Sequence, residues 1–475
     1  MSQGHKYSSR RHKGARRRDA TSHDKDKLPK NAPQIEVTIT HIGGRGDGVG
    51  IASYTHNYET KDYPVFVPDT LPGEIVIAQP LRLNKQGIQA ELRELIQSAP
   101  LRKAPDCDAS PACGGCQFQH MDPSAYQEWK QGQLRSVLQK GGIEPSKWRP
   151  DYQSAPHSRR RARLAFRRRR DDVLIGFRER QSHQIIYPSN CQVISKDISR
   201  LISFLQTNML LCLDNGMTGE VEITLCDNGC DVVFHSSESW PQSVVTDMIM
   251  MAADADIMRL SLSENNQAPH LLFVKQEPAI AWDYGKAKAS LYPAPASFLQ
   301  ADKAAETIMQ KDILSVLSQC NTIVDLFAGS GTLSAPLLLQ TRTGVKITAI
   351  DSAKEALSAY ESLAHRHGLS MQLATQSRNL HHAPFTIKEL EGFDAAIIDP
   401  PRAGANAQVT LLAQSDIPHI VMVSCNPHSF IKDAAILCAA GYDCQWVRHI
   451  DQFAFTSHSE VIAYFQKPAE TMAKA

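Results

Sequence analysis

The hydrophobic pattern of the chain is most regular from about residue 300 onward. Short apolar runs alternate there with stretches whose apolar residues recur at helical spacing. The pattern predicts strands at 322–327, 346–351, 394–399 and 419–425, and helices at 301–318, 332–340, 353–367 and 428–440. Strands and helices that alternate in this order predict an α/β fold with a doubly wound sheet of parallel strands.

Two less regular patterns precede this region. The short strands "IEVTIT", "VFV" and "EIVIAQ" lie between turn-rich segments and predict a small OB-like β-barrel. The next part mixes strands at 173–180, 219–224 and 230–236 with helices around 127–140, 193–208 and 241–254, which predicts an α+β domain. A chain of 475 residues has room for several domains. We expect four parts: a basic arm (1–33), the barrel (34–96), a central α+β domain (97–295) and the α/β domain (296–475).

The net charge of +1 conceals two strongly basic stretches. The first 33 residues contain ten lysines and arginines and almost no large apolar residue, so we expect a disordered basic arm. Residues 157–170, "HSRRRARLAFRRRR", contain eight arginines interleaved with Leu164 and Phe166, which predicts a strand with an arginine-rich face. Such a face is either a solvated surface or a phosphate-binding one, and the density of arginine favours phosphate contacts.

The eleven cysteines are unevenly spaced, and no secretory signal is recognised, so we expect reduced thiols in a cytoplasmic protein. No apolar run reaches the ~18 residues of a membrane span, so no membrane association is expected. Cys107, Cys113 and Cys116 form a C-x5-C-x2-C group in a segment without regular periodicity. Such thiolates suit either an iron-sulfur cluster or structural zinc, and the spacing alone does not decide between them.

A candidate cofactor loop follows the first strand of the α/β region. "DLFAGSGTLS" (325–334) places Gly329 and Gly331 between that strand and a helix, where glycine allows a ligand to approach the backbone closely. The next strand ends in Asp351, a position where an acid accepts ribose hydrogen bonds. An ordinary tight turn and an NAD site are the alternatives, but Ser334 stands where the longer NAD pattern needs glycine. The D-x-F-x-G-x-G pattern resembles the S-adenosylmethionine loop of class I methyltransferases.

Asp399 and Cys425 end later strands and should open onto the same crevice. Amine-directed methyltransferases resemble "IIDPPRAGA" (397–405) but carry an aromatic residue where Arg402 stands, so we expect a carbon acceptor instead. C5 of uracil becomes nucleophilic only after a group adds to C6, and a cysteine thiolate can add there. Cys425 precedes a helix whose N-terminal amides can lower the thiol pKa, although a cysteine in a strand is alternatively a small hydrophobe.

The same reaction needs a base that removes the C5 proton before the thiol leaves. "FAFTSHSEVIAYF" (453–465) offers Glu460 and His458 just before an apolar strand. A glutamate at a strand edge is usually a solvated charge, and His458 is alternatively a structural partner. Spacing alone therefore leaves these alternatives open.

At these motifs the chain resembles the RNA uracil-C5 methyltransferases, in particular the iron-sulfur subgroup that acts on large-subunit (23S) ribosomal RNA. "SCNP", "DPPRAG" and T-x-H-x-E at Thr456, His458 and Glu460 resemble its signatures in the same order, and the resemblance covers residues 35–467. It implies Cys425 as nucleophile and Glu460 as base. It also implies a set of residues that bind S-adenosylmethionine: Gln300 in "SFLQ", Phe327, Asp351, Asp399, Asn379 near the adenine, and Thr332, where the family carries an aromatic residue.

The resemblance extends to the substrate and to the cysteines. Phe298 falls where the family stacks the extruded target base, and we expect Arg402 to be a second substrate contact. Cys191 in "YPSNCQVI" matches the fourth ligand of a 4Fe-4S cluster, alongside Cys107, Cys113 and Cys116, with a structural or RNA-positioning role.

The N-terminal barrel resembles the TRAM domain of the same subgroup, which transfer-RNA members lack. The barrel together with the four cysteines therefore favours ribosomal RNA as the partner of a monomeric enzyme. Three alternatives stay open: a tRNA uracil-C5 methyltransferase, an RNA cytosine-C5 methyltransferase, which also adds a thiol to C6, and a non-catalytic RNA-binding or assembly factor.

Overall fold

The structure, a computed structural model, describes residues 26–180, 182–283, 288–340 and 344–468. These residues form two compact units that divide after Arg102. Most of the expected basic arm, residues 1–25, lies outside the described residues. Within the described ranges, no helix is both long enough and apolar enough to cross a membrane.

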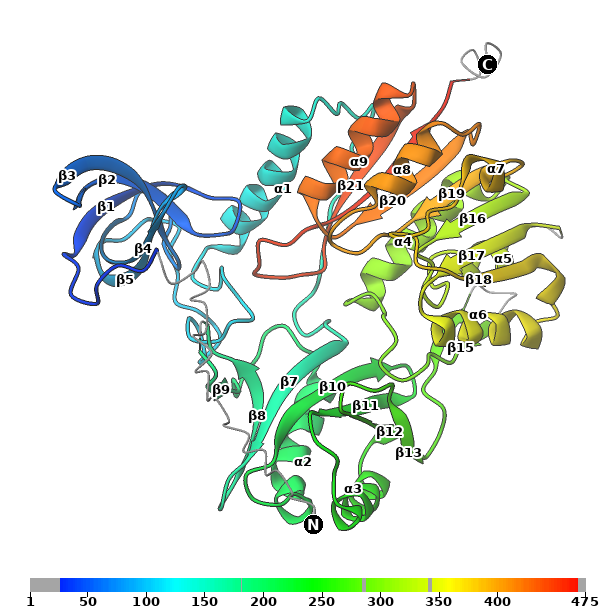
Figure 1. Cartoon of the computed structure of the whole chain (residues 1–475), viewed down its shortest axis with the longest axis horizontal. Helices are drawn as coiled ribbons and strands as arrows, with labels where there is room; N and C mark the ends of the chain where they lie inside the picture. The colour runs from blue at the N-terminus through cyan, green and yellow to red at the C-terminus, as the bar shows by residue number, and fades with distance from the viewer. Residues whose placement is uncertain (1–25, 181, 284–287, 341–343, 469–475) are drawn as a thin grey trace, which may run out of the picture. The chain divides into compact units, whose positions relative to one another are not determined.

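The first unit is a closed barrel with the strand order β1-β2-β3-β5-β4 (Figure 1). Its strands are β1 Ile35–Ile42, β2 Gly48–His56, β3 Glu59–Val67, β4 Ile75–Asn84 and β5 Gly87–Gln97. The predicted N-terminal β-barrel is confirmed, although the sequence pattern identifies neither β2 nor β5. β2 begins in a glycine-rich segment that resembles a turn. A Cβ on Gly50 would lie 2.3 Å from the carbonyl oxygen of Thr38, so the close approach of the paired strands requires glycine there.

One part of the second unit is a seven-stranded sheet of order β13-β12-β11-β10-β7-β8-β9. Its strands are β7 Arg161–Arg168, β8 Val173–Arg178, β9 Ile185–Ile186, β10 Thr218–Cys226, β11 Gly229–Ser236, β12 Ile257–Glu264 and β13 His270–Val274. The helices α2 Lys196–Cys212 and α3 Gln242–Asp254 share one buried core with alternate residues of the sheet, such as Leu164 and Phe234. Because side chains alternate along a strand, Arg161, Arg163 and Arg167 of β7 face the other side.

An eight-stranded sheet of order β18-β17-β16-β19-β20-β22-β21-β6 forms the rest of the second unit. Its strands are β6 Tyr152–Gln153, β16 Thr322–Leu326, β17 Lys346–Asp351, β18 Leu373–Ser377, β19 Ala395–Ile398, β20 His419–Ser424, β21 Asp443–Asp451 and β22 Glu460–Gln466. The strands from β18 to β20 are parallel, but β22 runs antiparallel to both of its neighbours. The four strands that were predicted as parallel, which correspond to β16, β17, β19 and β20, are parallel, whereas the sequence pattern did not predict the direction of β22. The loop 452–459 is too short for the crossover of about a dozen residues that parallel neighbours need.

Helices cover both faces of this sheet (Figure 1). They are α1 Pro123–Lys140, α4 Lys303–Leu317, α5 Ala335–Gln340, α6 Lys354–Arg366, α7 Ile387–Leu390, α8 Asn406–Ala413 and α9 Pro427–Ala439, with a 3-10 turn at Ser370–Gln372. The hairpin of β14 Ile280–Asp283 and β15 Lys288–Leu291 joins the core beside α4 and α6. Helix α1 shares its core with α9, and β6 pairs with β21. A segment of the expected central domain thus completes this second sheet.

Candidate active site

The loop after β16 has an unusual backbone at the carboxyl edge of the parallel strands. Phe327, Gly329 and Gly331 all have positive φ angles, of 63°, 55° and 73°. A Cβ on Gly331 would lie 2.1 Å from the ring of Tyr360, so only glycine fits there. Phe327 holds this conformation at a strain cost, which is typical of functional loops.

Asp351, at the end of β17, fixes this loop. Its carboxylate accepts hydrogen bonds from the backbone of Gly329 at 2.9 Å and of Ala353 at 2.7 Å. The rings of Phe327 and His381 lie 5.3 Å apart, and Asn379, just after β18, accepts from the backbone of His381 at 3.0 Å. Three of the predicted donor-binding residues, Phe327, Asp351 and Asn379, therefore meet at one edge of the sheet.

Thr332 lies in the same loop, where its carbonyl oxygen accepts a hydrogen bond of 2.7 Å from the side chain of Gln310 on α4. This contact uses the backbone of Thr332 and not its hydroxyl. The structure thus shows Thr332 as a backbone anchor of the loop, and it leaves the predicted donor contact of the side chain open.

A buried chain of amides and carboxylates runs from Asp399 to Glu460. The Gln300 amide donates to Asp399 at 3.1 Å, and the Gln452 amide donates both to Gln300 at 2.8 Å and to Glu460 at 2.7 Å. Burial raises the pKa of Asp399 to about 7. Burial, and then the charge of Asp399, raise the pKa of Glu460 well above its ordinary value. The pair therefore holds a proton near neutral pH.

Gln452 has no counterpart in the sequence analysis. It directly follows β21, and its side-chain oxygen also accepts from the backbone of Ala301 at 3.0 Å. The strand before it, DCQWVRHID, is largely polar in sequence, so the hydrophobic pattern gives no signal for this residue. The antiparallel placement of β22, which brings Glu460 opposite this position, was not predictable from the pattern.

Cys425 lies between the end of β20 and the start of α9, as the sequence predicts. Burial, followed by the charges of Glu460 and Asp399, raises the pKa of its thiol to about 11. The expectation that the helix N-terminus lowers this pKa is therefore wrong, because the two carboxylates and burial outweigh the amides. The charge of Arg402 opposes this shift.

Arg402 and His458 bring two loops together beside Cys425. A guanidinium nitrogen of Arg402 lies 3.5 Å from Nδ1 of His458. The side chain of Asn426 caps α9 through the backbone of His428 at 3.1 Å and donates to the carbonyl oxygen of Arg402 at 3.2 Å. Burial, and next the charge of Arg402, lower the pKa of His458, which favours its neutral form.

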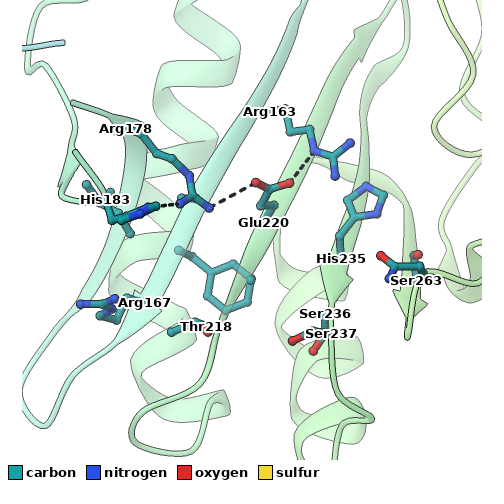
Figure 2. A pocket seen from close by; sticks show the side chains of 15 residues that line it. Arg163, Arg167, Arg178, His183, Thr218, Glu220, His235, Ser236, Ser237 and Ser263 are labelled. Carbon is teal, nitrogen blue, oxygen red and sulfur yellow. Dashed lines mark hydrogen bonds and ion pairs between the residues drawn. The ribbon is translucent and has the colours of Figure 1, made fainter. Parts of the chain in front are cut away.

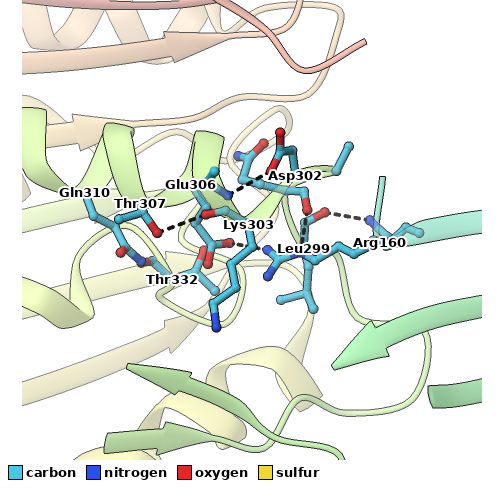
Figure 3. A network of polar contacts seen from close by, with 12 residues as sticks. Arg160, Leu299, Asp302, Lys303, Glu306, Thr307, Gln310 and Thr332 are labelled. Carbon is cyan, nitrogen blue, oxygen red and sulfur yellow. Dashed lines mark hydrogen bonds and ion pairs between the residues drawn. The ribbon is translucent and has the colours of Figure 1, made fainter. Parts of the chain in front are cut away.

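The segment 298–301 is held from the central sheet (Figure 3). Arg160 donates to the carbonyl oxygen of Gln300 at 2.9 Å and forms an ion pair of 2.7 Å with Glu306, both side chains being buried. The guanidinium of Arg161 lies 5.2 Å from the centre of the Phe298 ring, whose residue is 63% exposed. The segment thus presents Gln300 to the buried chain and Phe298 to solvent.

A second buried network lies beside the first. Lys130 on α1 forms an ion pair with Asp451, and the hydroxyl of Tyr126 donates to the same carboxylate at 2.9 Å. Lys130 also donates to the carbonyl oxygen of Phe453 at 3.2 Å. Asp451 precedes Gln452 in the chain, so this network fixes the backbone that carries Gln452. Sequence analysis gives no indication of it, because α1 and β21 are far apart along the chain.

The four predicted metal ligands are neighbours in space. Burial and then the charges of Cys191, Cys113 and Cys107 raise the pKa of Cys116 to about 12. Yet among the residues that the structure describes, no three or more His, Cys, Asp or Glu side chains are arranged to hold a metal ion. The segment after Cys116 reaches the loop 452–459, where the side chain of Gln117 accepts from the backbone of Ser457 at 2.8 Å.

Known proteins match both the sequence and the fold. The family model of tRNA (Uracil-5-)-methyltransferases matches residues 288–468. An uncharacterized RNA methyltransferase of Mesorhizobium japonicum is 31% identical over 434 residues, which cover 91% of this chain and 98% of that protein. A 23S rRNA (uracil(1939)-C(5))-methyltransferase, RlmD, of Alteromonas naphthalenivorans is 28% identical, over 92% of this chain and 90% of its own.

A solved structure shares the fold of most of the chain. The tRNA (uracil-54, C5)-methyltransferase of Pyrococcus abyssi, in complex with S-adenosyl-L-homocysteine, matches with a TM-score of 0.66 and 22% identity, over 90% of this chain and 99% of that one. The similarity includes the Rossmann-like methyltransferase fold. The chain belongs to the S-adenosylmethionine-dependent RNA uracil-C5 methyltransferase family, and is a methyltransferase of class EC 2.1.1.

Proposed function

We propose that this enzyme methylates C5 of a uridine in 23S ribosomal RNA through a covalent bond between Cys425 and C6 of the uracil. The observation that carries the proposal is the meeting of Cys425, Asp399 and Glu460 at one edge of the sheet, where the charges of both carboxylates act on the thiol. Relatives named as 23S rRNA uracil methyltransferases, aligned over most of the chain, support the RNA class.

In the proposed reaction, the sulfur of Cys425 adds to C6 and the electron pair of the C5–C6 bond moves onto C5 and O4. The thiol proton must leave first, since the thiol pKa of about 11 keeps it protonated near neutral pH. The thiol proton passes to solvent, so the Asp399–Glu460 pair, which shares one proton near neutral pH, keeps its one negative charge for the later proton removal. When bound, S-adenosylmethionine would supply an electrophilic methyl group to C5, and its sulfur would keep the electron pair of the broken S–CH3 bond.

Glu460, which carries the negative charge of the pair at this step, then removes the C5 proton and later releases it to solvent. The electrons of the C5–H bond re-form the C5–C6 double bond, and the sulfur of Cys425 leaves as thiolate. The hydrogen bond from Gln452 holds the Glu460 carboxylate in place for this step. Burial keeps the base strong, since its pKa is raised well above that of an exposed glutamate.

The donor would lie against the loop after β16. The crowded Gly331 and the positive φ of Gly329 leave a side-chain-free cradle there, and Asp351 beside it accepts ribose hydrogen bonds. We assign the donor contacts to Gln300, Phe327, Thr332, Asp351, Asn379 and Asp399. The exposed ring of Phe298 would stack on the extruded base, with Arg402 as a second substrate contact.

The four cysteines Cys107, Cys113, Cys116 and Cys191 would hold a 4Fe-4S cluster. Their all-thiol donor set and mutual electrostatic contact fit such a group. The ligand shell would close when the metal binds, as is common for metal sites. Protein purified without air should contain iron and sulfide, and Cys191→Ser should lose both; stoichiometric zinc without iron would contradict the assignment.

The barrel is proposed as a TRAM-type RNA-binding domain.

The test uses 23S rRNA from cells that lack the gene. The wild-type enzyme and S-adenosylmethionine should form 5-methyluridine in it, detected by nucleoside mass spectrometry. Cys425→Ala should form none, whereas Cys438→Ala on α9 serves as the matched control and should retain activity. Methylation of transfer RNA alone would overturn the ribosomal assignment, and full activity of Cys425→Ala would overturn the covalent mechanism.

A further inference from the structure

The free face of the central sheet forms an arginine-lined hollow (Figure 2). It has a volume of about 400 Å³, and Arg163, Arg167 and Arg178 line it against a single acid, Glu220. The pairing of β7 with its two neighbouring strands explains why these side chains lie together. Ala165 of β7 lies opposite Glu220 of β10 and opposite Gly176 of β8. Ala165 contributes only a methyl group between Arg163 and Arg167, which leaves the floor of the hollow low.

The arginines of this hollow are not held in buried ion pairs. Arg163 and Arg178 approach Glu220 from opposite sides, at 2.7 and 3.4 Å, and their side chains are 56% and 50% exposed (Figure 2). Exposed ion pairs of this kind contribute little to stability and exchange readily. Arg167 has no ion pair among the described residues, so the hollow carries an excess of positive charge.

The same face leads to the candidate active site. Arg161 and Arg163 both face this side of β7, and same-face residues of a strand are spaced by roughly 6.8 Å. Arg161 lies over the ring of Phe298 and donates to the carbonyl oxygen of Leu299 at 3.1 Å. Leu299 precedes Gln300, which contacts Asp399. Arg161 also forms an ion pair of 2.9 Å with Glu222, so this side of β7 is continuous with the segment proposed to receive the target base, whereas the excess positive charge lies in the hollow.

We propose that this hollow binds backbone phosphates of the RNA strand that flanks the target uridine, an inference that rests on the proposed RNA methylation. Arginine suits this ligand because its planar guanidinium pairs with two phosphate oxygens at once. A row of arginines that ends beside Phe298 holds the strand in register while the base is extruded. Phosphate contacts are independent of base identity, so the hollow sets affinity and orientation and not the choice of uridine.

The experiment measures the binding of protein-free 23S rRNA from cells that lack the gene, over a series of salt concentrations. Each single change, Arg163→Gln, Arg167→Gln or Arg178→Gln, should raise Kd roughly threefold to tenfold. The slope of log Kd against log salt should fall by ~0.7 for each lost contact to a single strand. The triple variant should show the combined effect.

Arg200→Gln is the matched control, because this substitution removes an equal charge on α2, which covers the opposite face of the same sheet. Its Kd and salt slope should equal those of the wild type. Equal slopes for the triple variant and the wild type would overturn the phosphate site. If the wild type forms no 5-methyluridine in this RNA, the proposed function fails instead, so the two failures are distinguishable.

Discussion

Two buried polar networks lie side by side behind this site, and they differ in one respect. Around Asp451, the carboxylate is paired with Lys130 and also accepts from Tyr126, so its charge is compensated inside the protein. Asp399 and Glu460 receive hydrogen bonds from amides only, and neither has a lysine or arginine ion-pair partner within the described residues. The compensated network is suited to holding the backbone in place. The uncompensated pair of Asp399 and Glu460 instead retains a proton until a nearby cation or a step of the reaction favours its ionised form.

The largest expected effect is on the uncompensated network. Glu460→Gln keeps the shape of the side chain but removes the proposed base, so the proposed adduct should form and fail to eliminate. Turnover should fall roughly a hundred- to ten-thousandfold. A denaturing gel with labelled 23S rRNA should show a protein–RNA band. Glu391→Gln, at an exposed glutamate, should behave like the wild type. Unimpaired methylation without an adduct would show that Glu460 is not the base.

In the compensated network, Lys130→Met should act on stability. It leaves the charge of Asp451 buried without its partner, which should lower the free energy of unfolding by about 3–5 kcal/mol. Guanidinium unfolding measures this change. Lys140→Met, an exposed position on the same helix, should leave stability unchanged, and Lys130→Met with Asp451→Asn should recover part of the loss. Equal stability of Lys130→Met and Lys140→Met would show that Lys130 does not compensate the buried charge of Asp451.

Gln452 joins the two networks and should give a smaller effect. Gln452→Leu removes the amide that holds both Gln300 and Glu460, so kcat should fall roughly tenfold, equivalent to about 1.4 kcal/mol. Steady-state kinetics on 23S rRNA measures the change. Gln414→Leu at an exposed position should have no effect. A change in KM alone would mean that Gln452 positions substrate and not the base.

The smallest expected effect is on how the free energy of unfolding depends on pH. The pKa of Asp399 is about 7 in the folded protein, above its ordinary value of 3.8, so the folded state holds the extra proton between these values. The free energy of unfolding should therefore fall as pH rises through this window. Asp399→Asn should weaken that dependence, as measured by urea unfolding at several pH values. An identical pH profile for both proteins would show that the pair carries no uncompensated charge.

The sequence reveals residues whose positions follow from a strand end. Asp351, Asp399 and Cys425 each end or follow a parallel strand, and parallel strands that alternate with helices have their carboxyl ends at one edge. Lys130 and Gln452 escape sequence analysis because their roles depend on partners brought together by tertiary pairing alone. The pKa of Cys425 was mispredicted for the same reason, since the carboxylate of Glu460 arrives through the antiparallel insertion of β22.

That insertion also bears on how the protein is made. β22 enters between β20 and β21, both of which precede it in the chain. During translation the edges of β20 and β21 that pair with β22 therefore stay unpaired until β22 is made. Open strand edges are templates for association with other chains. A product truncated before residue 460 would lack β22, so its sheet would keep open strand edges and it would be prone to aggregate.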